Sequence, residues 1–225
     1  MPAPCPSFGE LLALVEPALA AFGVDGAERR GEGTLAMQLA RWAELVAVWN
    51  QRIDLTAARS TAELVDLLVA DAALIAQASA PSEGGEPERW LDVGSGAGAP
   101  GLALALLRPE SSMTLVEPRA KRVAFLRTAL ATLGRTDVRV ERARSEDLPD
   151  ASCDAAVSRA TLAPESWILE GTRLARRFVW VLLAQGEAPP APELARLDRD
   201  ERYVWPLTRA ARRAVRYRVD PSATE

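Results

Sequence analysis

The chain of 225 residues contains no histidine and only two cysteines, Cys5 and Cys153. Imidazole is the side chain that most often titrates near neutral pH and is the commonest metal ligand. Its absence therefore excludes histidine catalysis and the common zinc sites. The two cysteines have no close partner in sequence, so we expect neither a disulfide framework nor a cysteine-ligated metal. We expect the functional site to hold no metal.

Long apolar runs are also missing. No stretch approaches the roughly 20 apolar residues of a membrane span, and residues 1–6 lack the basic start of a signal peptide. The apolar content of 48% is nevertheless enough for a substantial core, and the length suits one ordinary domain with an added element. We expect a folded monomer in the cytoplasm that does not contact a membrane.

A strong excess of positive charge is lacking as well, since the net charge is −4. This balance argues against a protein that coats nucleic acid, but the charges are unevenly placed. Residues 119–144 carry a net charge of +6 and residues 196–218 carry +5. Such segments could contact phosphates. They could equally be solvated faces of an arginine-rich chain.

Residues 91–101, which read LDVGSGAGAPG, are the most informative segment. An apolar strand here leads into a glycine-dense loop. The pattern predicts that a helix follows this loop, with Pro100 in its first turn. Glycines permit positive φ angles and a close approach of ligand to backbone N–H groups, as nucleotide cofactors require. Gly96, Gly98 and Gly101 have the G-x-G-x-x-G spacing of dinucleotide sites, but this spacing alone is weak evidence.

The next predicted strand, residues 113–117, ends in a carboxylate. A carboxylate at this strand end can accept hydrogen bonds from both hydroxyls of a ribose, so Glu117 is our candidate for that role. Asp92 is a second acid beside the glycine loop. The alternative for Glu117 is an ordinary solvated strand end.

The first third of the chain is predicted to be helical. Residues 8–21 and 62–78 have helical patterns, and Leu35, Leu39, Trp42, Val46 and Trp49 form one stripe of a helix that ends near Asn50. A polar break at residues 81–87 follows. We therefore expect an N-terminal helical extension, residues 1–80, and a second unit, residues 88–220.

Strands and helices alternate after the break. The expected strands are residues 89–93, 113–117, 137–141, 154–158 and 177–183, and the expected helices are residues 100–107, 120–133 and 165–175. Such alternation predicts an α/β fold whose sheet is mostly parallel with helices on both faces. Strand-like residues 201–205 and 214–219 could close the sheet as an antiparallel hairpin. Residues 187–195 are expected to form a loop or the start of a helix.

Several segments together resemble one family. They are residues 49–57, the glycine loop 91–101, Glu117, the segment Lys121–Arg127, Ser145-Glu146-Asp147-Leu148 and Ser158-Arg159-Ala160. Their order and spacing resemble those of the RsmG (GidB) family, the bacterial 16S ribosomal RNA guanine-N7 methyltransferases. The resemblance covers about residues 40–185.

The resemblance implies a class I S-adenosylmethionine (SAM) methyltransferase fold, Rossmann-like, with SAM as cofactor and 16S rRNA or the small ribosomal subunit as partner. It places Gly94 and Ala99 beside the methionine and ribose portion of SAM, Ser145 and Glu146 against the adenine, and Arg159 near the transferred methyl. The expected cofactor-binding set is Asp92, Gly94, Ser95, Gly96, Gly98, Ala99, Glu117, Ser145, Glu146 and Arg159. Arg159 is also the expected catalytic residue, and its alternative is a structural arginine paired with an acid.

The segment Lys121–Arg127 resembles a family helix whose basic face could support RNA. Its Val123, Phe125 and Leu126 are expected to lie in the core instead of contacting a ligand.

The implied chemistry is compatible with a chain that lacks histidine. Guanine N7 has an in-plane lone pair and no proton, so its attack on a sulfonium methyl needs no general base. Alignment of nitrogen, carbon and sulfur would supply the catalysis. An arginine plane such as that of Arg159 can also stack on a splayed RNA base.

The chain departs from the family pattern at several places. Residues 67–72 read LLVADA where the family usually carries Arg-His-x-x-Asp-Ser, Ala99 replaces an aromatic residue or leucine, and Gln185 stands in place of a lysine. Two alternatives therefore stay open beside rRNA methylation. One is a SAM enzyme that acts on another substrate, and the other is a ribosome-associated SAM-binding module without turnover. A nicotinamide oxidoreductase is a remote third.

Overall fold

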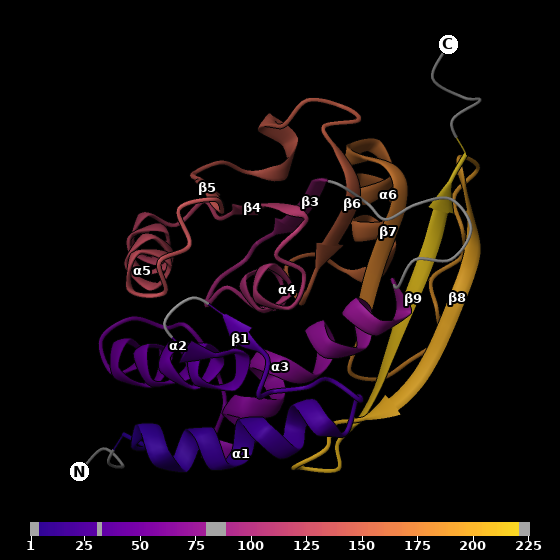
Figure 1. Ribbon diagram of the computed structural model, residues 1–225. Helices are drawn as coiled ribbons and strands as arrows, with labels where there is room; N and C mark the ends of the chain where they lie inside the picture. Colours follow the sequence, from indigo (N-terminus) through magenta and orange to yellow (C-terminus); the bar gives the residue numbers. More distant parts are fainter. Residues whose placement is uncertain (1–4, 31–32, 80–88, 221–225) are drawn as a thin grey trace.

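The centre of the computed structural model, which describes residues 5–30, 33–79 and 89–220, is a seven-stranded sheet (Figure 1). The strands are β3 (Arg89–Val93), β4 (Ser112–Val116), β5 (Arg139–Glu141), β6 (Cys153–Ser158), β7 (Ala175–Leu183), β8 (Ala195–Val204) and β9 (Ala211–Val219). They lie in the order β5-β4-β3-β6-β7-β9-β8. The first five are parallel, and β9 is antiparallel to both of its neighbours. The predicted, mostly parallel sheet is thus confirmed, and so is its closure by a C-terminal hairpin.

Six α-helices accompany the sheet in the described residues. They are α1 (Phe8–Ala20), α2 (Leu35–Asn50), α3 (Thr61–Ala78), α4 (Gly101–Leu107), α5 (Ala120–Thr132) and α6 (Pro164–Leu174). The first three begin at side-chain caps: Ser7, Thr34 and Ser60 each accept a hydrogen bond from the backbone N–H three residues later. The three predicted N-terminal helices are confirmed.

Apolar residues alternate between the two faces of the central strands, and each face has its own layer of helices. Trp90 of β3 belongs to one buried cluster, together with residues of α1 to α5, whereas the adjacent Leu91 belongs to a second cluster with Trp167 of α6. This alternation follows from the two-residue repeat of a strand. Helices therefore cover both faces, as the sequence predicts.

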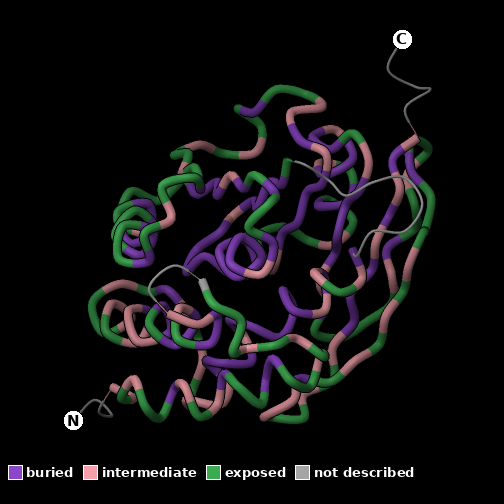
Figure 2. Tube along the Cα trace, viewed as in Figure 1, coloured by how far each residue is buried: buried purple, intermediate pink, exposed green. Residues whose placement is uncertain are grey.

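The N-terminal helices share the core of the sheet. Trp42 of α2 and Leu115 of β4 are each fully enclosed within one continuous apolar cluster, and Figure 2 shows buried residues along both sides of the contact between helices and strands. The polar break proposed as a boundary falls on residues 80–88, which lie outside the described residues. The division into residues 1–80 and 88–220 stays a prediction.

The largest difference from the sequence-based elements concerns β8. The sequence indicated a strand over residues 201–205, but β8 begins at Ala195. Ala195 is buried, whereas most of the following residues of β8 are exposed or half-buried, because the strand lies at the edge of the sheet. An edge strand made largely of charged residues lacks the apolar run that would reveal it. The two-residue strands β1 (Arg29–Arg30) and β2 (Gly33–Thr34) were likewise not predicted.

Candidate active site

A cleft of about 370 Å³ opens at the carboxyl ends of β3, β4 and β6. It is lined by residues 55–57, 94–97, 117–119 and 159–161 together with Leu67, Ala99 and Arg122. Ligands of open parallel sheets bind at this edge, and the volume lies within the range of small-molecule sites. A larger apolar hollow of about 540 Å³ lies near the amino ends of β6 and β7, and none of the predicted site residues lines it.

The glycine loop after β3 forms one wall of the cleft. Gly94, Gly96 and Gly98 have φ values of +73°, +56° and +99°, which residues other than glycine rarely adopt. A Cβ on Gly94 would lie 2.0 Å from Oγ1 of Thr161, whereas a Cβ on Gly96 would meet nothing closer than 3.8 Å. The loop is therefore closely packed at its start and open to the cleft at Gly96, where a ligand can approach the backbone.

Gly98 does not line the cleft. A Cβ on Gly98 would lie 3.1 to 3.3 Å from side-chain atoms of Leu102, Leu126 and Trp42, so this glycine permits close packing beneath the loop.

Glu117 lies directly beside the glycine loop and is only 2% exposed. Its Oε2 accepts the Gly96 N–H at 3.0 Å and its Oε1 accepts the Arg119 N–H at 2.9 Å. The alternative of a solvated strand end is therefore wrong. A carboxylate offers about four lone-pair sites, so two acceptor positions remain for the hydroxyls of a ribose. The open loop and this carboxylate fit the sugar of a nucleoside cofactor.

Asp92, the second predicted acid, lies beneath the loop and does not line the cleft. Its side chain is fully buried, and Oδ2 accepts the Gly101 N–H at 3.0 Å at the start of α4. Oδ1 has no hydrogen-bond partner among the described residues. Burial raises the pKa of this carboxyl to about 6, although the bond from Gly101 opposes the shift. Pro100 lies immediately before α4, one residue earlier than predicted.

Arg159 follows β6 and lines the cleft while pairing with an acid. Its Nη1 donates to Oδ2 of Asp71 at 2.9 Å and to the carbonyl of Leu67 at 2.6 Å, both on α3. Structural pairing and a place in the cleft, which the sequence left as alternatives, therefore coexist. The acid, Asp71, lies on helix α3.

The N-terminal part supplies a wall of the cleft that we did not name as a site from the sequence. Asn50 shapes the loop after α2, since its Oδ1 accepts the N–H groups of Leu55 and Thr56. Arg122 of α5 donates two hydrogen bonds to the carbonyl of Asp54, at 3.0 and 2.7 Å. The motif over residues 49–57 was the available signal, but its spatial partner on α5 is remote in sequence.

Helix α2 also supports the glycine loop directly. The indole Nε1 of Trp42 donates to the carbonyl of Ala97 at 3.1 Å, although the two residues are 55 positions apart. The regular stripe of α2 predicted that Trp42 is buried, and its exposure is 0%. This bond ties the extension to the loop of the candidate site.

The model of the GidB family, described as rRNA small subunit methyltransferase G, matches residues 36–200. The chain belongs to this family. The protein named ribosomal RNA small subunit methyltransferase G in Anaeromyxobacter sp. (strain Fw109-5) is 31% identical over 194 residues, which are 81% of this chain and 87% of that protein. Its counterpart in Alkalilimnicola ehrlichii is 36% identical over 182 residues, or 79% of each chain. A third, in Halorhodospira halophila, is 39% identical over 129 residues and matches only 58% of that protein's length.

Solved structures share the fold of this GidB family member at low sequence identity. A SAM-dependent methyltransferase from Aquifex aeolicus superposes with a TM-score of 0.50 at 18% identity, over 69% of this chain and 92% of the other. A Pyrococcus horikoshii protein, for which an RNA methyltransferase activity has been suggested, gives 0.52 at 12% identity, over 94% and 98% of the two chains. These likenesses confirm the fold class that the sequence predicted.

Besides Asp92 and Gly98, two further residues of the expected cofactor-binding set lie outside the lining of the cleft. Ser145 and Glu146 are on a short 3₁₀-helix between β5 and β6. Arg173 of α6 donates to the carbonyl of Ser145 at 2.9 Å, and Glu146 is exposed. Their contact with an adenine stays a prediction.

The family departures at residues 67–72 fall close to the site. Leu67 lines the cleft where the family usually has an arginine, and Leu68 is 1% exposed within the core. Asp71, which keeps the family residue, is the partner of Arg159. The predicted core positions Val123, Phe125 and Leu126 on α5 are all buried, as expected.

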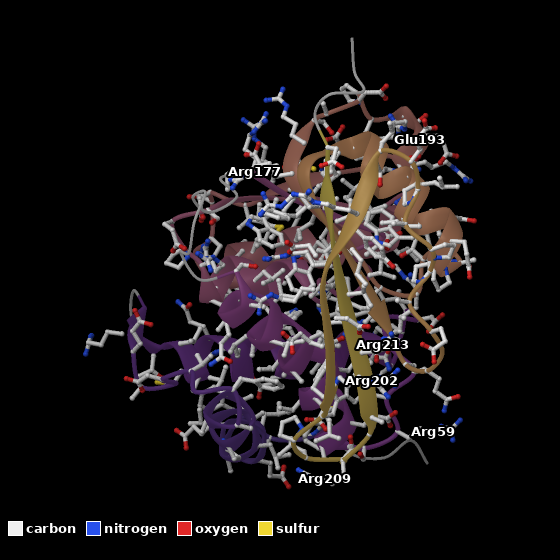
Figure 3. All side chains as sticks on the ribbon, turned by 90° about the vertical axis from the view of Figure 1, so that its right-hand side faces the viewer. Arg59, Arg177, Glu193, Arg202, Arg209 and Arg213 are labelled. Atoms are coloured by element: carbon white, nitrogen blue, oxygen red, sulfur yellow. The ribbon has the colours of Figure 1, made fainter. Side chains whose placement is uncertain are left out.

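Most arginines of the C-terminal basic segment have acidic partners. Arg213 contacts Asp200 at 2.6 Å and Glu187 at 2.8 Å, and Arg216 contacts Asp198 at 2.5 Å. Figure 3 shows Arg202 and Arg213 along the β8–β9 hairpin, with Arg209 at its end. These pairs favour the interpretation of this segment as a charged sheet edge over a phosphate-binding surface.

Three further features bear on the sequence-based exclusions. Cys5 is half-buried and Cys153 is buried, and burial raises the pKa of the Cys153 thiol to about 12. Within residues 5–30, 33–79 and 89–220, no group of acidic or cysteine side chains is arranged to hold a metal ion. No described helix is both long enough and apolar enough to cross a bilayer.

Proposed function

We propose that the protein is a SAM-dependent methyltransferase that methylates N7 of a guanine in the RNA of the small ribosomal subunit. The observation that carries the proposal is the cleft at the carboxyl edge of the sheet, where the open glycine loop meets the buried carboxylate of Glu117. Membership of the GidB family supports the choice of ribosomal RNA as substrate.

The residues of the cleft divide the work of binding. Glu117 would accept hydrogen bonds from the ribose of SAM, and the loop around Gly96 would face the same nucleoside. Arg159 would lie near the methyl group, where its guanidinium plane can stack on the acceptor base. Ser145 and Glu146 lie outside the lining of the cleft. They would therefore contact the adenine only where that ring extends beyond the cleft.

The reaction requires no proton transfer. When bound, SAM would supply a methyl group on a positively charged sulfur. The N7–carbon bond would form as the carbon–sulfur bond breaks, so that the positive charge passes to the guanine and S-adenosylhomocysteine remains as a neutral thioether. The contribution of the protein is alignment of the reacting atoms, which is worth several kcal/mol in well-oriented reactions. A chain without histidine can therefore perform it.

The test is transfer of labelled methyl from SAM to small ribosomal subunits and to naked 16S rRNA, both prepared from a strain that lacks the gene. Chemical cleavage at N7-methylguanosine then locates the product. Labelling at one guanine is expected. SAM binding without labelling of either RNA form would refute rRNA methylation, and a preference for NADH over SAM in calorimetric titration would refute the cofactor.

One observation favours a second candidate. Leu67 lines the cleft in place of the family arginine, which removes a cation that could orient RNA. A SAM enzyme that methylates a different substrate would tolerate this loss. Restoring the family residue with Leu67→Arg distinguishes the two, because higher methyl transfer to ribosomal RNA is expected only if RNA is the substrate.

A further inference from the structure

Asp71 of α3 receives three side-chain hydrogen bonds from two distant parts of the chain. Its Oδ1 accepts the Tyr203 hydroxyl and the Trp205 indole N–H, each at 2.7 Å, and its Oδ2 accepts Nη1 of Arg159 at 2.9 Å. The Asp71 side chain is only 3% exposed. A buried carboxylate with this many donors is held rigidly in one orientation.

Arg159 is fixed through one of its three nitrogens. Nη1 makes both bonds to α3, one to Asp71 and one to the carbonyl of Leu67. Within the part of the chain that the structure describes, Nε and Nη2 donate no hydrogen bond. The side chain is 19% exposed and lines the cleft. The remaining donors are thus available to a ligand while the guanidinium is anchored from behind.

The donors to Oδ1 come from the C-terminal hairpin. Tyr203 lies in β8 and Trp205 directly follows it, both beyond the last residue, 200, of the family match. Burial and the nearby Asp71 charge raise the pKa of Tyr203, so its hydroxyl keeps the proton that it donates. The guanidinium of Arg212 lies over the Trp205 ring, 3.6 Å from its centroid, and this contact helps to hold the indole in place.

We propose that Asp71 is a positioning residue of the candidate active site and that the β8–β9 hairpin, through Tyr203 and Trp205, holds it in place. The carboxylate fixes Nη1 of Arg159 so that the other guanidinium nitrogens meet the ligand in the cleft. The inference rests on the proposed function in one respect, the contact of Arg159 with that ligand.

The chain contains a matched control on the same helix, five residues before Asp71. Asp66 of α3 is also fully buried and also binds the hairpin region, accepting the N–H groups of Leu207 and Thr208 and the Thr208 hydroxyl. It makes no contact with Arg159 among the described residues. Asp66→Asn therefore perturbs the same helix and the same hairpin without touching the guanidinium.

The experiment measures binding of S-adenosylhomocysteine by calorimetry to the full chain and to the variants Asp71→Asn, Asp66→Asn, Arg159→Ala and Asp71→Asn/Arg159→Ala. An asparagine can keep its oxygen toward Tyr203 and Trp205. Its NH₂ group then faces Nη1 of Arg159, and because both groups are donors, no hydrogen bond forms between them. Loss of a charge-assisted bond of this kind should raise Kd about tenfold. We expect the same in Arg159→Ala, no further rise in the double variant, and a Kd within about twofold of wild type in Asp66→Asn.

Additive effects of Asp71→Asn and Arg159→Ala would overturn the inference, because residues that act through one another show strong coupling. An equal loss in Asp66→Asn would overturn it too, by showing that the hairpin acts through stability alone. An unchanged Kd in Arg159→Ala would also overturn the inference, because Arg159 would then make no contact with the ligand for Asp71 to position. If Asp71→Asn does not fold, Tyr203→Phe takes its place, with an expected rise of about threefold and an unchanged Kd as the contrary result.

Failure of the proposed function would look different. Binding of S-adenosylhomocysteine needs no RNA, so the coupling between Asp71 and Arg159 is measurable even if no ribosomal RNA is methylated. Where transfer does occur, kcat and KM for the RNA give a second readout, and the coupling should be seen in the ratio kcat/KM.

Discussion

The carboxyl of Asp92 should make the stability of the protein fall as pH rises between about 4 and 6. Its pKa is raised from 3.8 to about 6 in the folded state because the side chain is entirely buried beneath the glycine loop. The folded protein therefore binds this proton more tightly than the unfolded chain does. Raising the pH through this window removes the proton and costs folding free energy.

The magnitude follows from the size of the shift. A shift from 3.8 to about 6 is roughly two units, and each unit corresponds to about 1.4 kcal/mol, so ionised Asp92 lowers the free energy of unfolding by about 3 kcal/mol above pH 6. Below pH 4 the contribution vanishes, since the group is protonated in both states. Burial is the structural origin of the cost, and Oδ1 accepts no hydrogen bond among the described residues that would offset it.

The assay is urea unfolding of the wild type and of Asp92→Asn at several values between pH 4 and 7.5. Asparagine can still accept the Gly101 N–H, the bond that Oδ2 makes at 3.0 Å, but it carries no charge. The free energy of unfolding of the variant should rise relative to wild type by about 3 kcal/mol across the window. Using the difference between the two proteins removes the titration of every other group.

Asp137 is a suitable control with the opposite sign. A hydrogen bond from Arg135 holds its pKa below the usual range, so its stabilising effect is present above the ordinary pKa of an aspartate and is lost as pH falls through the lowered value. Asp137→Asn should therefore lower the free energy of unfolding by a constant amount at neutral pH, and its difference from wild type should shrink only at the acid end. Parallel profiles of wild type and Asp92→Asn would refute the account of a buried, ionising carboxyl.

Three further substitutions test the cleft. Gly94→Ala places a Cβ 2.0 Å from Oγ1 of Thr161 at a φ of +73°. The free energy of unfolding should fall by at least about 1 kcal/mol, and binding of S-adenosylhomocysteine should be lost. A variant that matches wild type in calorimetry and urea unfolding would contradict the tight packing. Glu117→Gln keeps the shape of the side chain but removes its charge, and the Kd for S-adenosylhomocysteine should rise at least tenfold in calorimetry. An unchanged affinity would exclude a role of Glu117 in holding the ribose. Trp42→Phe removes the hydrogen bond from the indole to the carbonyl of Ala97, which should lower the free energy of unfolding by about 1 kcal/mol. An unchanged urea midpoint would show that this bond contributes nothing to stability.

The fold could be predicted because its signals are local. The stripe of α2, the alternation of strands and helices after residue 88, and the glycine loop are each visible in a short window of sequence. The first part of the edge strand β8, residues 195–200, was not predicted, because its charged and mostly exposed residues carry no apolar pattern. Its true start is set by pairing with β9, from Ala195 opposite Val219, and this pairing is a tertiary contact.

The candidate site was predictable only in part, for the same reason. Glycine spacing and a strand-terminal acid identified the loop and Glu117, and the structure brings the two together through the bond from Gly96. Asp92 carries the same chemical type as Glu117, but its side chain turns beneath the loop toward α4. Which way a carboxylate faces depends on packing that no single segment encodes.

The sequence by itself determined the class of sheet, the glycine turn that leaves room for a nucleotide, and the exclusion of histidine chemistry, because each depends on residue type and short-range spacing. Only the tertiary structure decided that Arg159 is anchored by Asp71, 88 residues earlier, and that Tyr203 and Trp205 join them from the C-terminal hairpin. Hydrogen bonds between such distant positions depend on how helices and strands pack around the shared core, and local periodicity carries no record of them.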